Sequence, residues 1–212
     1  MDMSKILTNV VTSSGETVQQ ISVNQPVLMV FLRHFGCTFC REALDEISKK
    51  KAEIENGGAK IVFVHMSDAK TADEYFKRFN IENPTHICDP NCKLYQQFGL
   101  VKGSFQQLFG FNVWLRGVEA NIKHKYGLGR FLGDAFQMPG VFVIRNGTIR
   151  EQYIHKQASD KPNYQEMAAC CVVWCGINKF FGSLTHVVIR EEQKNNLPVW
   201  IILFSKRVRD RL

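Results

Sequence analysis

The chain has 212 residues, of which 45% are hydrophobic and 22% are charged, and its formal net charge at pH 7 is +7. These proportions are ordinary for a soluble globular protein, and the length suits one domain with a modest appendage. We expect no membrane span, since no apolar run approaches the ~20 residues that it needs, and no secretory leader. The positive charges are scattered, which favours a solvated surface over a nucleic-acid partner.

The seven cysteines are an odd number and form no regular framework. Secreted disulfide scaffolds usually carry paired cysteines at characteristic spacings. We therefore expect free thiols in a reducing compartment and a cytoplasmic protein.

The N-terminal segment is rich in β-branched residues. Residues 6–11 and 17–23 flank a turn pattern at residues 13–16, Ser-Ser-Gly-Glu. This arrangement predicts a β-hairpin.

The next segment predicts a strand–helix–strand unit. Residues 27–32 and 60–66 are apolar runs typical of buried strands, and residues 38–55 between them carry apolar side chains on one helical face. Residues 84–88 predict a third, short strand. A right-handed crossover makes the first two strands parallel, so the loops that follow them lie at the same edge of the sheet.

A Cys-x-x-Cys pair, Cys37 and Cys40, follows the first of these strands at the start of the helix. Free backbone N–H groups and the positive end of the helix dipole favour a thiolate there, and Arg33 and His34 add nearby donors or positive charge. Thr38 is the first residue of the predicted helix. This placement predicts a redox-active pair.

Two other interpretations of the pair stay open. The cysteines could be small buried hydrophobic residues, or they could belong to a zinc site. Cys88, the last residue of the third strand, and Cys92 would then supply the remaining two sulfurs. Our expectation is that the four sulfurs do not bind a metal.

Residues 101–136 form an insertion before the next strand. Its apolar residues recur at spacings of three and four and predict one helical stripe that faces the core; they are Leu108, Phe111, Leu115, Val118 and Ile122. A ligand-binding or partner-binding role for this stripe is the alternative. Residues 141–144 and 149–155 then predict a hairpin with an Asn-Gly turn.

Four blocks of the sequence, in order, resemble the peroxiredoxin-like branch of the AhpC/TSA (alkyl hydroperoxide reductase and thiol-specific antioxidant) family: FLRHFGCTFCREAL, CDPNCKLYQQFGL, QMPGVFVIRNGTI and YIHKQASDKPNY. The resemblance implies an α/β, thioredoxin-like fold, a three-layer sandwich with a mixed central sheet and a helical insertion before the proline strand. By the same resemblance, Pro139 is a cis-proline that packs against the cysteine pair; the alternative is a trans-proline that merely starts an edge strand. It places the domain at residues 1–168 and leaves residues 169–212 as a C-terminal tail of uncertain structure.

The resemblance also implies an antioxidant thiol oxidoreductase, an enzyme that needs no cofactor. Its expected site has three catalytic residues, three supporting residues and no metal: Cys37, Cys40 and Pro139, with Arg33, His34 and Thr38. A thioredoxin- or glutathione-type reductant would regenerate the pair, and a peroxide, a lipid peroxide or a disulfide would be the substrate. The oligomeric state stays open.

The peroxiredoxin motif Pro-x-x-x-Thr/Ser-x-x-Cys is only partly present. If Cys40 takes the place of the peroxide-attacking cysteine, Cys37 stands at the threonine position and Arg33 at the proline position. Two cysteines at a helix start favour dithiol/disulfide exchange, with Cys37 attacking and Cys40 resolving, although the alignment favours the reverse order. The alternative function is a non-catalytic redox sensor or interaction scaffold, which would show no turnover.

Overall fold

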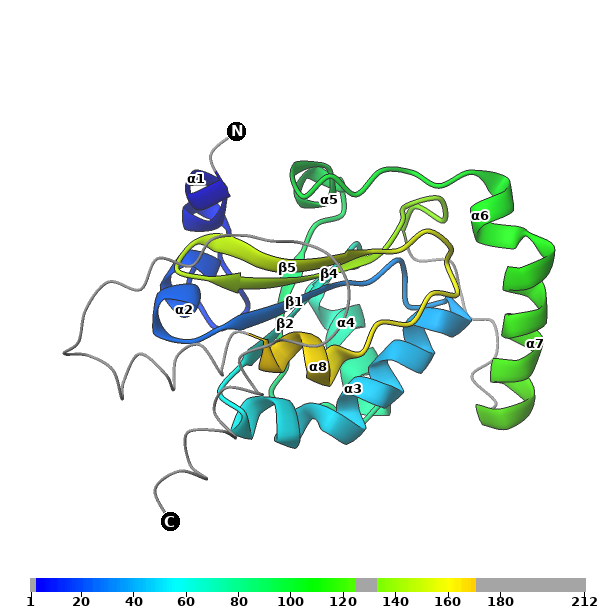
Figure 1. The fold of residues 1–212 in the computed structure, drawn as a ribbon, viewed down its shortest axis with the longest axis horizontal. Coiled ribbons are helices and arrows are strands. Elements are labelled where there is room, and N and C mark those ends of the chain that lie inside the picture. The colour runs from blue at the N-terminus through cyan, green and yellow to red at the C-terminus, as the bar shows by residue number, and fades with distance from the viewer. Residues whose placement is uncertain (1–2, 125–132, 171–212) are drawn as a thin grey trace, which may run out of the picture. The chain divides into compact units, whose positions relative to one another are not determined.

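A computed structural model of the chain describes residues 3–124 and 133–170. Within these residues a five-stranded sheet, in the order β3-β2-β1-β4-β5, lies between helices (Figure 1). No helix in these two stretches is long and apolar enough to cross a membrane. The predicted tail lies outside the described residues from position 171 onward, so its boundary with the domain stays a prediction.

The sheet is mixed, as predicted. Three strands run parallel, β1 (Val27–Phe31), β2 (Lys60–His65) and β3 (Thr85–Cys88). The other two, β4 (Gly140–Arg145) and β5 (Thr148–Ile154), form a hairpin, and β4 pairs antiparallel with β1. The parallel strands place the segments after β1, β2 and β3 at one edge of the sheet, where the cysteine pair lies.

One face of the sheet is covered by α3 (Thr38–Asn56), α4 (Ala69–Arg78) and α8 (Tyr164–Ala169) (Figure 1). Successive side chains of a strand point to opposite faces, so alternate residues of β1 meet these helices. Leu28 and Val30 belong to this layer of the core and are fully or almost fully buried. This face therefore carries the helix that begins at the cysteine pair.

The opposite face is covered by α1 (Met3–Asn9), α2 (Val18–Asn24) and α5 (Lys93–Gln97). Met29 and Phe31, the other alternate residues of β1, are buried in this layer. Two helical layers with a sheet between them confirm the predicted three-layer α/β sandwich.

The predicted N-terminal hairpin is wrong, because α1 and α2 are helices. A single bridge between Val11 and Thr17 is all the strand pairing that the segment shows. Thr17 begins α2 with a capping box: its hydroxyl accepts from the backbone N–H of Gln20 at 3.2 Å, and the Gln20 side chain accepts from the Thr17 N–H at 2.8 Å. Burial of residues such as Ile6 and Leu7 against the sheet overrides the β propensity of the sequence.

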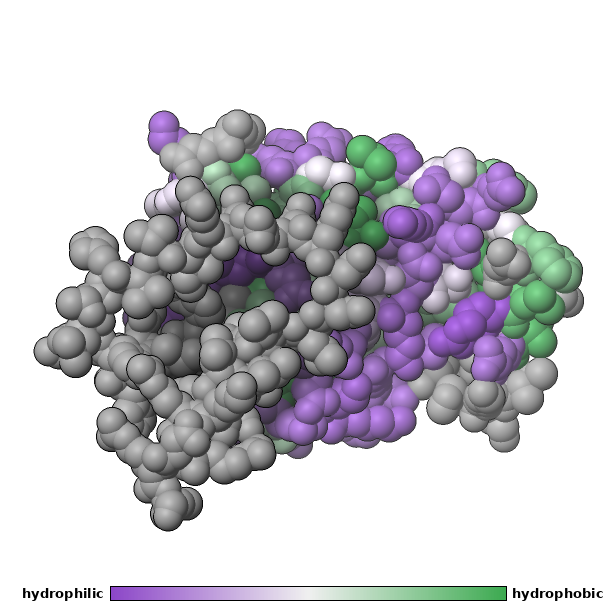
Figure 2. Space-filling model, viewed as in Figure 1, coloured by the Kyte–Doolittle hydropathy of each residue, from purple (hydrophilic) through white to green (hydrophobic). Residues whose placement is uncertain are grey.

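The insertion is helical, as predicted, and forms α6 (Phe105–Phe109) and α7 (Phe111–His124). Three residues of its predicted apolar stripe, however, do not face the core. The exposed fraction is 73% for Phe111, 47% for Leu115 and 37% for Val118. We call these three residues the α7 apolar face; hydrophobic surface is visible over this part of the chain in Figure 2.

The contacts of the insertion explain why the α7 apolar face is exposed. The helix α7 meets α3 through an ion pair, in which Nη2 of Arg116 lies 2.8 Å from Oε1 of Glu42. Leu108 is the buried member of the stripe and packs in a small cluster with Phe39. The side chain of Ile122 lies outside the described part of the chain. The ion pair with α3 and the small cluster around Leu108 thus hold α7 with its apolar face toward solvent.

The peptide bond before Pro139 is trans, since the described residues contain no cis peptide bond, and the predicted cis-proline is wrong. The trans form of an X–Pro bond is lower in free energy by about 0.5–1 kcal/mol. The segment is also anchored in this form: the N–H of Met138 donates to the carbonyl of Val101 at 3.2 Å, and the carbonyl of Pro139 accepts from the N–H of His155 at 3.4 Å.

The hairpin between β4 and β5 turns through two residues, as predicted. Asn146 and Gly147 have φ values of 51° and 71°, the positive values that a type I′ turn needs. A Cβ at Gly147 would lie 2.4 Å from Oε1 of Gln19. Both the backbone conformation and this close approach therefore favour glycine.

Replacing Tyr95 by phenylalanine is expected to destabilise the fold by about 1–3 kcal/mol, since it leaves a buried carbonyl without its donor. The Tyr95 hydroxyl bonds to the carbonyls of Leu32 and Val64, at the ends of β1 and β2, and is 3.1 Å from the latter. Urea unfolding would show a lower midpoint with an unchanged slope. Tyr153→Phe, at a ring that is 36% exposed, is the matched control and should change little.

Candidate active site

The cysteine pair lies where β1 leads into α3. Cys37 is the N-cap residue of α3, and Cys40 lies in its first turn. Both side chains are buried, both thiols are free, and the two sulfurs are not at disulfide distance.

The two thiols differ in acidity. A hydrogen bond from the Cys40 thiol lowers the pKa of Cys37 to about 6, and the charge of Arg33 adds to this effect against the opposing effect of burial. The backbone N–H groups of Phe39 and Cys40, at the start of the helix, lower it further. The same hydrogen bond, burial and the neighbouring thiolate raise the pKa of Cys40 well above its ordinary value. At neutral pH Cys37 is the thiolate and Cys40 is the thiol that donates to it.

Arg33 contacts both cysteines. Its guanidinium Nη1 lies 3.5 Å from Sγ of Cys37, and its backbone N–H donates to Sγ of Cys40 at 3.3 Å. Nε and Nη2 of the same guanidinium donate to the carbonyl of Ala135, with 2.8 Å for Nε. The segment that leads into β4 thus fixes the position of the cation beside the thiolate.

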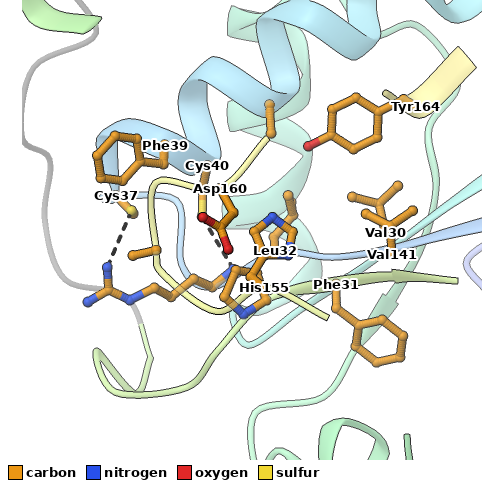
Figure 3. Close-up of a pocket in the computed structure, with 14 residues that line it drawn as sticks. Val30, Phe31, Leu32, Cys37, Phe39, Cys40, Val141, His155, Asp160 and Tyr164 are labelled. Carbon is orange, nitrogen blue, oxygen red and sulfur yellow. Dashed lines mark hydrogen bonds between the residues drawn. The ribbon is translucent and has the colours of Figure 1, made fainter. Parts of the chain in front are cut away.

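A small pocket of ≈ 30 Å³ opens beside the two sulfurs (Figure 3). It brings together four of the predicted site residues, Cys37, Cys40, Arg33 and Pro139. Its volume suits a water molecule or another molecule of that size. A long substrate would have to leave most of its length outside.

The pocket also contains polar residues that the sequence analysis did not select, namely His155, Asp160 and Tyr164. Burial lowers the pKa of His155 to about 4, although Asp160 opposes the shift, so the imidazole is neutral at pH 7. Burial likewise raises the pKa of Tyr164, which keeps its proton. All three residues come from the YIHKQASDKPNY block, whose clustered His, Asp and Tyr were the signal available in the sequence.

Two predicted supporting residues do not line the pocket. His34 is buried, and burial together with Arg33 and Arg41 lowers its pKa to about 4. Its carbonyl accepts from the N–H of Cys37 at 3.0 Å, so its backbone shapes the turn before the helix. Thr38 is buried as the first residue of α3.

Cys88 and Cys92 also lie away from the pocket. Sγ of Cys88 lies 3.9 Å from Nε2 of His65, and Sγ of Cys92 lies 3.2 Å from Sδ of Met66. Burial raises the pKa of both thiols above their ordinary value. Neither of these cysteines has the electrostatic surroundings of Cys37.

Known sequences resemble this chain to different extents. The model of the AhpC/TSA antioxidant enzyme family matches residues 46–159, which include Pro139 and His155 but not the cysteine pair. A prostamide/prostaglandin F synthase of Salmo salar is 27% identical over 152 residues, which are 69% of this chain and 75% of that protein. The chloroplastic thioredoxin-like protein AAED1 of Arabidopsis thaliana is 23% identical over 70% of this chain and 63% of its own length.

Solved structures agree on the fold. Peroxidoxin BcpB from Mycobacterium tuberculosis matches with a TM-score of 0.53 and 11% identity, over 78% of this chain and 90% of that chain. A yeast mitochondrial 1-Cys peroxiredoxin matches with a TM-score of 0.54 and 11% identity, over 85% and 78%. The family match spans more than half of the chain, and the fold is that of peroxiredoxins. The chain therefore belongs to the AhpC/TSA antioxidant enzyme family and is a peroxiredoxin-like thiol oxidoreductase.

Proposed function

We propose that the protein reduces hydroperoxides and also disulfides. In both reactions Cys37 is the nucleophile and Cys40 is the resolving thiol. The observation that carries the proposal is the opposite shift of the two thiol pKa values within one buried pair, beside the Arg33 guanidinium. A low-pKa thiolate is the reactive form in thiol chemistry. A protonated partner three residues along can then close the intramolecular disulfide.

A hydroperoxide would be reduced in three steps: attack by Cys37, resolution by Cys40 and reduction of the resulting disulfide. The Cys37 thiolate attacks the terminal oxygen, an S–O bond forms, the O–O bond breaks, and the alkoxide takes a proton to leave as the alcohol. Cys40 then loses its proton and attacks the sulfur of the sulfenic acid, which releases water and forms the Cys37–Cys40 disulfide. An external dithiol reduces this disulfide and is itself oxidised.

The reductant that we propose is a thioredoxin- or glutathione-type thiol. The yeast mitochondrial 1-Cys peroxiredoxin is described as resolving its thiol via glutathione and thioredoxin systems, which is support by likeness. We also propose a cytoplasmic location, since free thiols persist in reducing compartments.

We further propose that the hydroperoxide carries an apolar tail. The pocket of ≈ 30 Å³ accommodates the reacting group only. Next to it, Phe39 lines the pocket, and a Cβ at Gly117 of α7 would lie 3.7 Å from its ring. The α7 apolar face lies on the same helix and is exposed to solvent outside the pocket. The relatives from Salmo salar and Danio rerio are both named prostamide/prostaglandin F synthase, so their names refer to lipid products, which agrees with a lipid tail here.

Turnover tests the oxidoreductase proposal. With thioredoxin, thioredoxin reductase and NADPH, the wild-type chain should consume NADPH in response to a hydroperoxide, and the Cys37→Ser/Cys40→Ser variant should not. The matched control is Cys88→Ser/Cys92→Ser, which should retain activity. If the wild type reacts once and then stops even with ample reductant, the non-catalytic redox sensor becomes the better description.

Substrate preference tests the lipid proposal. The double variant Phe111→Ser/Leu115→Ser should lower kcat/KM for a fatty-acid hydroperoxide several-fold and leave kcat/KM for hydrogen peroxide unchanged. The proposed long tail would contact these exposed side chains, whereas hydrogen peroxide has no tail. The control is Lys49→Ser/Lys51→Ser on α3, a pair outside the α7 apolar face and the pocket. An equal loss with both peroxides would refute the role of the α7 apolar face.

A further inference from the structure

A second group of reactive side chains lies on β2 and β3, apart from the cysteine pair. His65 ends β2 and stands opposite Cys88 in the parallel register, while His86 stands opposite Phe63. His86 and Cys88 are two residues apart on one strand, so they share a face of the sheet, and this face also carries His65. The sequence His-x-Cys on one strand and a histidine on the next thus places three ligand-type side chains together.

The donor atoms of these side chains are close. Nε2 of His65 lies 2.9 Å from Nδ1 of His86 and 3.9 Å from Sγ of Cys88. One ligand atom from each residue lies within 4.8 Å of the others, and this is the one such group of three or more His, Cys, Asp or Glu residues in the described part of the chain. A tetrahedral zinc ion with Zn–N of about 2.0 Å and Zn–S of about 2.3 Å spaces its ligands by about 3.3 Å (N to N) and about 3.6 Å (N to S). Shifts of a few tenths of an ångström would bring the two pairs that include His65 to these separations, and the His86 and Cys88 ligand atoms already lie within 4.8 Å of each other.

The surroundings hold the two imidazoles in position. The His65 ring lies 5.3 Å from the Phe35 ring, and the His86 ring lies 5.5 Å from the Phe76 ring, centroid to centroid. Both histidines are buried, with exposed fractions of 1% and 4%. Burial keeps them neutral, which is the form that binds a metal.

A carboxylate stands behind one of the rings. Oδ1 of Asp73 lies 3.3 Å from Nε2 of His86, the ring nitrogen that does not face His65. Metal-bound histidines commonly donate their second N–H to such a carboxylate, which fixes the ring and makes it a better ligand. This contact has the geometry of the outer, carboxylate–histidine part of such a site.

We propose that His65, His86 and Cys88 bind a zinc-type divalent transition metal. Two imidazole nitrogens and a thiolate form a ligand set that suits Zn²⁺. Cys88 is exposed, so the metal enters from its side, and a water molecule completes the tetrahedron. On binding, the Cys88 thiol releases its proton to solvent.

Titration of the metal-free, full-length protein tests the proposal. Co²⁺ is the probe, since a tetrahedral site with one thiolate gives visible d–d bands and a thiolate-to-metal charge-transfer band, and Zn²⁺ should displace it. We use the Cys37→Ser/Cys40→Ser background so that the cysteine pair cannot contribute. One equivalent should bind. Cys88→Ser should abolish the charge-transfer band and weaken binding at least tenfold.

The outer carboxylate provides a graded variant that does not disturb the core. Asp73→Asn, at an exposed side chain, should weaken Co²⁺ binding about tenfold, in the range found for outer-shell partners. The matched controls are Glu74→Gln, the neighbouring exposed carboxylate on α4, and Cys170→Ser, another exposed thiol; both should bind as the parent.

Either of two results would overturn the metal site. One is the absence of tetrahedral Co²⁺ bands in the parent, which would leave the two histidines as a hydrogen-bonded neutral pair. The other is binding that Cys88→Ser does not change. These readouts do not involve turnover, so their failure leaves the proposed peroxide chemistry untouched.

Discussion

Cys37→Ser is expected to lower peroxide turnover to the uncatalysed background, whereas Cys40→Ser should still react once and then stall. The reason is that the pKa of Cys37 is lowered and that of Cys40 is raised, so in the proposed mechanism Cys37 attacks and Cys40 resolves the intermediate. Loss of a nucleophile that forms the covalent intermediate typically removes most of the catalysis, here at least about 1,000-fold.

Mass spectrometry after one equivalent of peroxide distinguishes the two roles. Cys40→Ser should accumulate the sulfenic acid or a mixed disulfide on Cys37, and Cys37→Ser should show no such adduct at Cys40. The opposite pattern would assign attack to Cys40, the order that the peroxiredoxin alignment favours. Cys92→Ser, a buried thiol outside the pocket, is the control for loss of any cysteine.

Arg33→Met is expected to raise the pKa of Cys37 and shift its reactivity to higher pH. In the wild type, the rate of Cys37 alkylation should rise with pH to a midpoint near 6, because the thiolate is absent below that pKa and complete above it. Removing the guanidinium removes one of the causes of the low pKa, so the midpoint should move toward the ~8.5 of a free cysteine. The variant also loses the bonds to the Ala135 carbonyl, which should loosen the segment before β4.

The matched control for this experiment is Arg41→Met. Arg41 is a nearby cation on α3, and its guanidinium donates to the Phe35 carbonyl at 2.9 Å, but it is not among the causes of the Cys37 shift. In this variant the pH midpoint of Cys37 alkylation should stay near 6. Equal shifts in both variants would mean that total charge, and not the Arg33 contact, sets the acidity of Cys37.

Several parts of the fold could be predicted because they depend on local or periodic patterns. The apolar run of β1, the amphipathic helix α3 and the Asn146–Gly147 turn each have a sequence pattern that only one local structure fits. The N-terminal segment has no such pattern, since residues such as Ile6 and Leu7 fit a strand and a buried helical face equally well. Packing against the sheet decided between the two.

The candidate site could likewise be predicted only in part. The helix start predicted a thiolate at the cysteine pair, but the order of the two pKa values depends on which thiol donates to the other and on where the guanidinium lies. His155 and Tyr164 come from distant positions in the chain and reach the pocket only through the sheet and α8. Pairwise distances of this kind are not encoded in spacing along the chain.

Local sequence patterns were enough to predict the α/β class, the parallel strand–helix–strand unit and a cysteine pair at a helix start, because hydrophobic periodicity and helix-end signals act over a few residues. Three features could not be predicted in this way: which face of α7 is exposed, the trans peptide bond before Pro139, and the convergence of His65, His86 and Cys88. Each of these depends on strand register and on packing between segments far apart in the chain, where the free energy of burial and of long-range hydrogen bonds outweighs local preference.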